Sequence, residues 1–150
     1  MIGLTATSSR ATEHPQWLGD PTGTVLYLRG VPIWQQHDRT ETMVQVVSGV
    51  VKLFRNWDTN RRILVGLRGP GSMLGLEQAA GGRPQPFQAV ALTRCRVAVW
   101  SHSDVRAALA TIPGAPAAVV DALWQNQTEI LNTFQALADG TVKERLARCL

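Results

Sequence analysis

The 150-residue chain contains only two cysteines, Cys95 and Cys149, and this scarcity excludes several kinds of protein. Two thiols cannot build the disulfide framework of a small secreted domain. They are also too few for a four-cysteine iron–sulfur cluster. Because Cys95 falls on an expected strand and Cys149 on an expected helix, we predict buried structural thiols rather than redox switches.

Long hydrophobic runs are lacking too. No apolar stretch approaches the roughly 18–20 residues that a membrane-spanning helix needs. The N-terminus shows no basic-then-apolar signal pattern. We therefore expect a cytoplasmic protein with no membrane partner.

Clusters of charge and of catalytic residues are equally scarce. The net charge is +4, but the fifteen basic residues are scattered from Arg10 to Arg148, and only Arg61 and Arg62 are adjacent. This spread favours a mildly basic, solvated surface over direct DNA contact by this segment. No Ser–His–Asp, paired-carboxylate or metal-ligand pattern is present, so the sequence predicts no enzyme, no metal and no cofactor.

Histidines are few, and both histidines and tryptophans are dispersed along the chain. The histidines lack the spacing of metal ligands and are expected at the surface, and the tryptophans are expected to pack in the core and at interfaces. These residues are His14, His37 and His102, and Trp17, Trp34, Trp57, Trp100 and Trp124.

From Val25 to Trp100 the chain consists of short apolar runs separated by turn residues, which is typical of all-β sandwiches and barrels. Ser48-Gly49 is expected to form one hairpin turn and Asp58-Thr-Asn60 another. We predict a mainly β fold, a jelly roll or double-stranded β-helix, because rolling up removes exposed strand edges. The expected strands are Val25–Leu28, Ile33–Gln35, Met43–Val47, Val50–Arg55, Arg62–Leu67, Phe87–Leu92 and Arg96–Trp100.

Two finer expectations accompany this fold. Ile63, Val65 and Leu67 alternate along one strand, which predicts a shared half-buried face. The residues before about Asp20 are polar without a period and are expected to form a loosely held arm.

After Ser101 the period becomes helical. Ser101-His-Ser-Asp104 is similar to a capping box that opens a short helix ending near Ile112-Pro113. A long helix follows, with Pro116 in its first turn. Its spacing of 3, 4, 3, 4 and 3 predicts a heptad seam, which could pack on the chain's own sheet or on a second subunit. With a β-roll before it, a parallel two-fold dimer is favoured, and Gln127 is the polar residue that could fix its register. The seam consists of Val120, Leu123, Gln127, Ile130, Phe134 and Leu137.

The segment from Arg68 to Val97 carries a further pattern. A Gly-Pro-Gly turn, the short apolar piece Met73-Leu74, Gly75, a short helix, a loop and a strand follow one another. This order resembles the phosphate-binding cassette of the cyclic-nucleotide-binding fold. With the hairpin Met43–Leu53, in which Ser-Gly joins two strands, the chain resembles the sensory domain of the catabolite-activator/fumarate–nitrate-regulator (Crp/Fnr) superfamily. In Ile33–Asp38, His37 stands where that family usually has glycine.

The resemblance implies a pocket but not its usual chemistry. Relatives that bind cyclic nucleotides hold the ribose with a Glu after the cassette glycine and the phosphate with an Arg-Ser pair. Leu76 and Gln85-Pro86 occupy those places here, and neither supplies the required charge. Glu77 and Arg83 are suitable in chemistry but offset in position, and the purine positions look like Ile130 and Leu131. We expect a degenerate pocket around Gly75, taking a small, less charged molecule or a different anion.

The resemblance therefore implies an effector-sensing and dimerisation domain of a transcription regulator. Residues 1–112 would be the arm, the β-roll and a short helix, and residues 113–150 the dimerisation helix and the lead-in to an absent DNA-binding domain. The expected partners are a second copy, an unknown small-molecule effector, and DNA through a helix-turn-helix beyond Leu150. The alternative is a stand-alone ligand-binding or protein-interaction module with a degenerate pocket and no DNA function.

Overall fold

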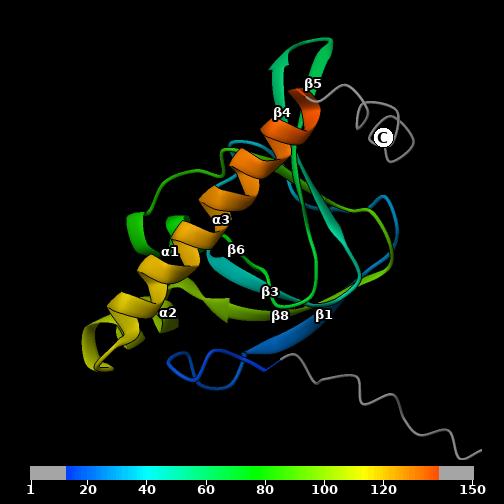
Figure 1. Cartoon of the computed structure of the whole chain (residues 1–150). Coiled ribbons are helices and arrows are strands. Elements are labelled where there is room, and N and C mark those ends of the chain that lie inside the picture. The colour runs from blue at the N-terminus through cyan, green and yellow to red at the C-terminus, as the bar shows by residue number, and fades with distance from the viewer. Residues whose placement is uncertain (1–12, 139–150) are drawn as a thin grey trace, which may run out of the picture.

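A computed structural model of the chain describes residues 13–138. Within them, eight strands precede and flank three helices, and two four-stranded antiparallel sheets pack together as a β-roll (Figure 1). One sheet has the order β1-β8-β3-β6 and the other β2-β7-β4-β5. The strands are β1 (Gly23–Tyr27), β2 (Pro32–Trp34), β3 (Thr42–Ser48), β4 (Val51–Asp58), β5 (Arg61–Arg68), β6 (Met73–Leu74), β7 (Gln88–Ala91) and β8 (Cys95–Ser101). The predicted jelly roll and its seven strands are thus confirmed.

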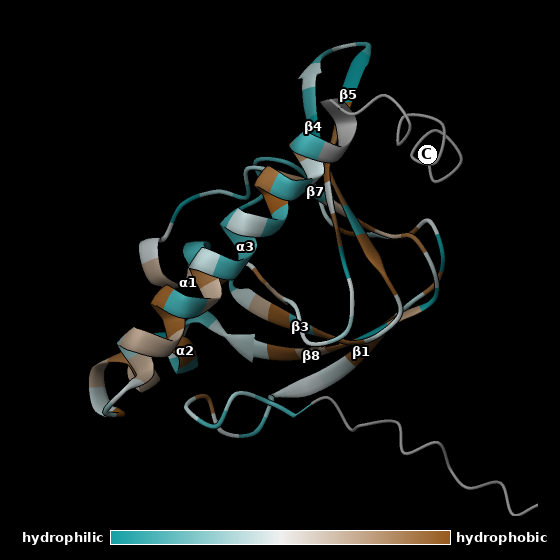
Figure 2. Cartoon of the chain, viewed as in Figure 1, coloured by the Kyte–Doolittle hydropathy of each residue, from teal (hydrophilic) through white to brown (hydrophobic). Residues whose placement is uncertain are grey.

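The main core lies between the two sheets. Val46, Val51 and Val97 are fully buried there, and Cys95 is buried among them as a free thiol. Figure 2 shows the contrast between these hydrophobic strands and the hydrophilic tip of the β4–β5 hairpin, which extends away from the roll. A second core joins the first sheet to the helices around Met43 and Trp100.

A β-bulge overturns the expected alternation in β5. Leu53 pairs with Gly66 while its neighbour Phe54 pairs with Leu64, so Val65 is an additional residue on its strand. The bulge changes the phase of the side chains beyond it. Leu67 is therefore 38% exposed instead of buried, and Arg68 is 2% exposed.

Three helices close the end of the roll. Helix α1 (Leu76–Gly81) follows β6, and α2 (His102–Thr111) follows β8. The Ser101 hydroxyl accepts a hydrogen bond from the Asp104 amide, which confirms the predicted helix start. The long helix α3 (Ala115–Ala138) then runs across the roll from α1 and α2 towards the β4–β5 hairpin (Figure 1). None of the helices within residues 13–138 is long and apolar enough to cross a membrane.

Two expectations about surface residues are wrong. Residues 1–12 of the predicted arm lie outside the described residues. The rest of the arm is held: His14 Nδ1 lies 2.9 Å from the Gln45 side-chain oxygen, and the His14 ring packs edge-on against Trp100. Leu18 is buried in the second core. His102 is also buried, because it occupies the first turn of α2 against that core. By contrast, Trp57 and Trp124 are 68% and 69% exposed, whereas Trp100 is fully buried.

Candidate functional site

The cassette is fastened to β3 and turns at Gly75. The Val46 amide donates to the Ser72 carbonyl, and the Gly71 amide donates to the Val46 carbonyl. Gly75 has φ +84° and joins β6 directly to α1. A side chain at Gly75 would be strained at this φ, and its Cβ would lie 3.3 Å from the Gln85 side-chain nitrogen. Glycine is thus required where the chain turns into the pocket wall.

A cavity of about 320 Å³ lies between the cassette, the β-roll and α3. Its walls are mainly apolar, from Trp34, Leu53, Phe87 and Ile130. Six of the eight residues that the sequence placed in a pocket do line this cavity: Gly75, Glu77, Arg83, Gln85, Pro86 and Ile130.

The other two predicted pocket residues lie elsewhere. Leu76 is fully buried in the second core, because the first turn of α1 directs it towards β3 and α2. Leu131 is 61% exposed on the outer side of α3. Successive helical residues are separated by about 100°, so Ile130 and Leu131 cannot both face one cavity of the same chain.

Gln85, which the resemblance places at a phosphate-binding position, instead fastens a loop. Its side-chain nitrogen donates to the Thr40 hydroxyl at 2.9 Å, and its carbonyl accepts from the His37 amide at 2.7 Å. Its own amide donates to the Asp38 carbonyl. His37 adopts φ +71°, a conformation that suits glycine better than a residue with a side chain. Gln85 therefore holds the turn and brings no charge to the cavity.

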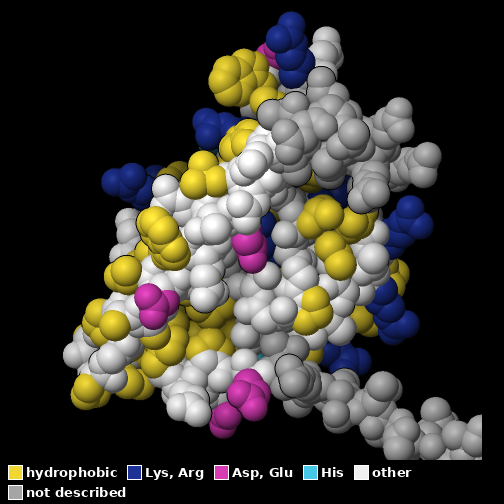
Figure 3. Space-filling model, in the orientation of Figure 1, with side chains coloured by type: hydrophobic (Ala, Val, Ile, Leu, Met, Phe, Trp, Pro, Cys, Tyr) yellow, Lys and Arg dark blue, Asp and Glu magenta, His cyan; other side chains and the backbone are white. Residues whose placement is uncertain are grey.

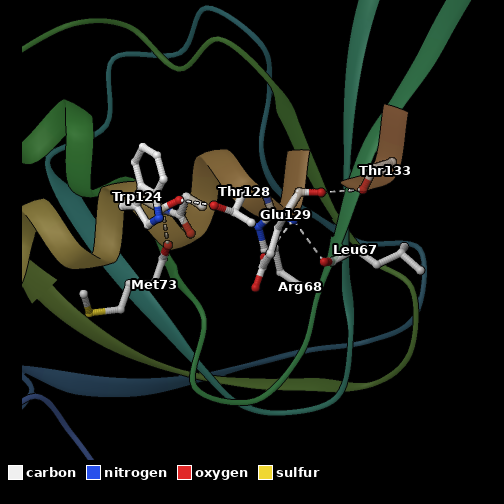
Figure 4. A network of polar contacts seen from close by, with 8 residues as sticks. Leu67, Arg68, Met73, Trp124, Thr128, Glu129 and Thr133 are labelled. Atoms are coloured by element: carbon white, nitrogen blue, oxygen red, sulfur yellow. Dashed lines mark hydrogen bonds and ion pairs between the residues drawn. The ribbon is translucent and has the colours of Figure 1, made fainter. Parts of the chain in front are cut away.

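The charged group that the sequence did not predict at the site is Arg68. Figure 4 shows it extending from β5 towards Glu129 of α3. Its Nη1 lies 3.1 Å from the Glu129 carboxylate and also donates to the Leu67 carbonyl at 3.1 Å. Its Nε is buried and has no hydrogen-bond partner within residues 13–138. Desolvation lowers the pKa of Arg68 from its ordinary value, while Glu129 and Glu77 act in the opposite direction.

Gly66 makes room for this arginine. A Cβ at Gly66 would lie 2.6 Å from Arg68 Nη1, so the absence of a side chain there admits the guanidinium. A second contact ties α3 to the cassette, because the Asn126 side chain donates to the Met73 carbonyl at 3.4 Å. The long helix is thus a wall of the cavity, and polar contacts join it to β5 and β6.

The outer face of α3 carries a row of exposed apolar side chains. Figure 3 shows hydrophobic side chains along α3 on the side turned to the viewer. Two members of the predicted seam, Leu123 and Ile130, instead pack against the chain's own cores. Gln127 is exposed between the outer residues, and the side chain of Leu137 lies outside the described residues. The outer row consists of Val120, Trp124, Leu131 and Phe134, which are 64%, 69%, 61% and 48% exposed.

No group of three or more His, Cys, Asp or Glu side chains within residues 13–138 could hold a metal ion. The charged residues that line the cavity are Arg68, Glu77 and Arg83.

A β-roll with a glycine-centred cassette, closed by a long helix over one apolar cavity, defines the class of cyclic-nucleotide-binding folds. The chain belongs to the cyclic nucleotide-binding domain family, whose match covers residues 24–111. No curated protein sequence matches the chain significantly.

Solved structures of transcription regulators share this fold. The catabolite activator protein of Thermus thermophilus is 25% identical, with a TM-score of 0.63 over 78% of this chain and 55% of that protein. The c-di-GMP-responsive regulator CLP of Xanthomonas campestris is 20% identical, with a TM-score of 0.71 over 88% of this chain and 66% of that protein. The N-terminal domain of a transcriptional regulator from Streptomyces coelicolor A3(2) is 22% identical, with a TM-score of 0.58 over 74% of this chain and 77% of that one.

Proposed function

We propose that this chain is the effector-sensing and dimerisation domain of a Crp/Fnr-type transcription regulator. It would act in the cytoplasm, bind its effector without catalysis, and signal through α3 to a helix-turn-helix beyond Leu150. The observation that carries the proposal is the position of α3, whose inner face closes the cavity while its outer face presents an apolar row. Coupling between two sites needs an element whose conformational equilibrium both sites can shift. The inner face of α3 would meet the effector, and its outer face would meet the second copy.

The dimer would form through the outer row of α3. The residues of this row are spaced 4, 7 and 3 positions apart, which is the spacing of a coiled-coil seam. They are Val120, Trp124, Leu131 and Phe134. Gln127 falls between them and would set the register. A second copy related by a two-fold axis would bury this row against itself.

Sedimentation tests the dimer. We expect the wild-type chain to sediment as a dimer and a Trp124→Asp/Leu131→Asp variant as a folded monomer. Asn132→Asp, an exposed helix position outside the row, is the matched control and should remain dimeric. Asp at Leu123 or Ile130 would not serve, because both side chains pack inside the chain's own cores. A wild-type chain that is monomeric at every concentration would exclude the dimer.

We also propose that the pocket does not take cyclic nucleotides. The two anchoring positions that the resemblance implies hold the uncharged residues Leu76, which is in the core, and Gln85, which is held by Thr40. Adding cyclic AMP or cyclic GMP should leave the melting temperature unchanged. A true ligand at 100 times its dissociation constant would add about 2.7 kcal/mol, or roughly 5–11 °C for a chain of this size. Such a shift with either nucleotide would overturn the proposal.

The DNA-binding function is tested by the coding sequence that follows Leu150. A regulator requires two further helices with a basic recognition face. A reading frame that stops there would favour the stand-alone ligand-binding module instead.

A further inference from the structure

Arg68 is a buried cation whose hydrogen-bonding capacity is only partly used. It is 2% exposed, it lines the cavity, and its Nε has no partner within residues 13–138. Its one ionic partner in the same residues is Glu129, whose side chain is 48% exposed and can therefore return to water. A guanidinium presents donors in a planar fork that suits a carboxylate. The cavity thus contains an anion-binding group already desolvated by the fold.

The rest of the cavity limits what could reach that group. The walls are apolar because they are formed mainly by Trp34, Leu53, Phe87 and Ile130. The volume of about 320 Å³ is near the lower limit for small-molecule sites. Arg83 and Glu77 also line the cavity with opposite charges. One anionic group on a small apolar body matches this combination better than a highly charged ligand does.

We propose that the cavity binds a small organic carboxylate, whose carboxylate pairs with Arg68 in competition with Glu129 of α3. This inference rests on the proposed function, because it assigns a ligand class to the same pocket. The Arg68 Nε has no hydrogen-bond partner within residues 13–138, and two carboxylates on one buried cation repel each other. Occupation therefore weakens the bond between β5 and α3, and the helix loosens where Glu129 holds it.

The proposal predicts opposite effects for the two ends of the ion pair. Arg68→Met removes the cation and lowers carboxylate affinity by tenfold or more, since a charge-assisted hydrogen bond is lost. Glu129→Gln removes the internal competitor and raises affinity several-fold. A purely structural ion pair would give weaker binding in both variants. Arg96→Met, an exposed arginine on β8, is the matched control and should bind as the wild type does.

The experiment is calorimetric titration of the 150-residue chain with benzoate, with benzamide as the neutral counterpart and phenyl phosphate as the alternative anion. We expect benzoate to bind in the millimolar range and benzamide not to bind. Thermal melts of each variant establish that it is folded, and Arg68→Lys, which keeps the charge, should retain part of the affinity. Tighter binding of phenyl phosphate than of benzoate would overturn the assignment to carboxylates.

Coupling to the helix has its own readout. Benzoate should accelerate amide hydrogen exchange in α3 around Glu129 in the wild type but not in Glu129→Gln. Absence of benzoate binding to both the wild type and Glu129→Gln would overturn the inference. If sedimentation still shows a dimer, the proposed function stands without the proposed carboxylate ligand.

Discussion

The contact between Arg68 and Glu129 should be unequal in its effect on stability, because its two ends are unequally buried. The guanidinium is 2% exposed and the carboxylate 48% exposed. Removing the carboxylate leaves a cation in a site from which it cannot return to water. Removing the cation leaves a carboxylate that can.

The magnitudes follow from this difference. We expect Glu129→Gln to lower the free energy of unfolding by about 1–3 kcal/mol, since the buried charge loses its ionic partner. Arg68→Met should change it by less than about 1 kcal/mol, because a flexible apolar side chain replaces a desolvated charge. The double variant should match Arg68→Met alone, because without the cation the carboxylate has no ionic role.

Urea unfolding followed by tryptophan fluorescence measures all three variants, since Trp34 and Trp100 are buried in the two cores. In melting experiments each kcal/mol corresponds to about 2–4 °C for a chain of this size. Asp121→Asn, an isosteric loss of charge at an exposed position of the same helix, should stay within about 0.5 kcal/mol of the wild type. A stable Glu129→Gln beside a severely destabilised Arg68→Met would refute the reasoning from burial.

Three other perturbations test the fold. Gly49→Ala should lower the free energy of unfolding in urea by about 2–5 kcal/mol, because φ is +88° and the added Cβ meets the Arg94 carbonyl. Gly30→Ala, with φ +82° and open space around it, should lower that free energy by only about 1–2 kcal/mol. His37→Gly should raise stability by up to about 1 kcal/mol, since it relieves φ +71°, and a lower melting temperature would contradict this. Burial lowers the pKa of His102 below its ordinary value, so the unfolded chain takes up the proton first and stability falls as pH drops below about 6.5. Melts across that range should show a shallower decline for His102→Gln, the slope from one group being at most about 1.4 kcal/mol per pH unit.

Local signals predicted most of the fold. Short apolar runs between turn residues located the seven expected strands, because alternation and turn chemistry act over a few residues. The Ser101 cap was predictable for the same reason, since its partner Asp104 is three residues away. The cassette was found through the order of its pieces, and six of the eight expected pocket residues line the cavity.

The centre of the site was not predictable, because it depends on a bulge and a long-range contact. The additional residue Val65 reverses the alternation that Ile63, Val65 and Leu67 suggest, and so it turns Arg68 inward. No feature of the sequence connects Arg68 with Glu129, which lies 61 positions later (129 − 68) on another element. Gly66 was a possible clue, since a glycine inside a strand often marks a close approach.

The heptad seam predicted from the sequence combines residues from two adjacent faces of α3, because both faces carry apolar side chains. A spacing of 3 and 4 fits Leu123 and Ile130 as well as Trp124 and Leu131, and periodicity alone cannot assign them to inner and outer contacts. The tertiary fold makes that assignment, because Leu123 and Ile130 complete the chain's own cores. Packing on the chain's own sheet, one of the two interpretations that the sequence left open, therefore applies to Leu123 and Ile130. Packing on a second subunit stays a prediction for the neighbouring face.

This arrangement would let a small ligand in the cavity affect the outer face of α3. Ile130 faces the cavity and Leu131, the next residue, belongs to the outer row. A helix is stiff, so a rotation that moves Glu129 away from Arg68 moves Leu131 by the same angle. If two copies pack through the outer rows, that rotation changes the packing between them at the same time. Coupling would then require no chain of intermediate residues, because the residues that would contact the ligand and those that would contact the second copy are adjacent on one rigid element.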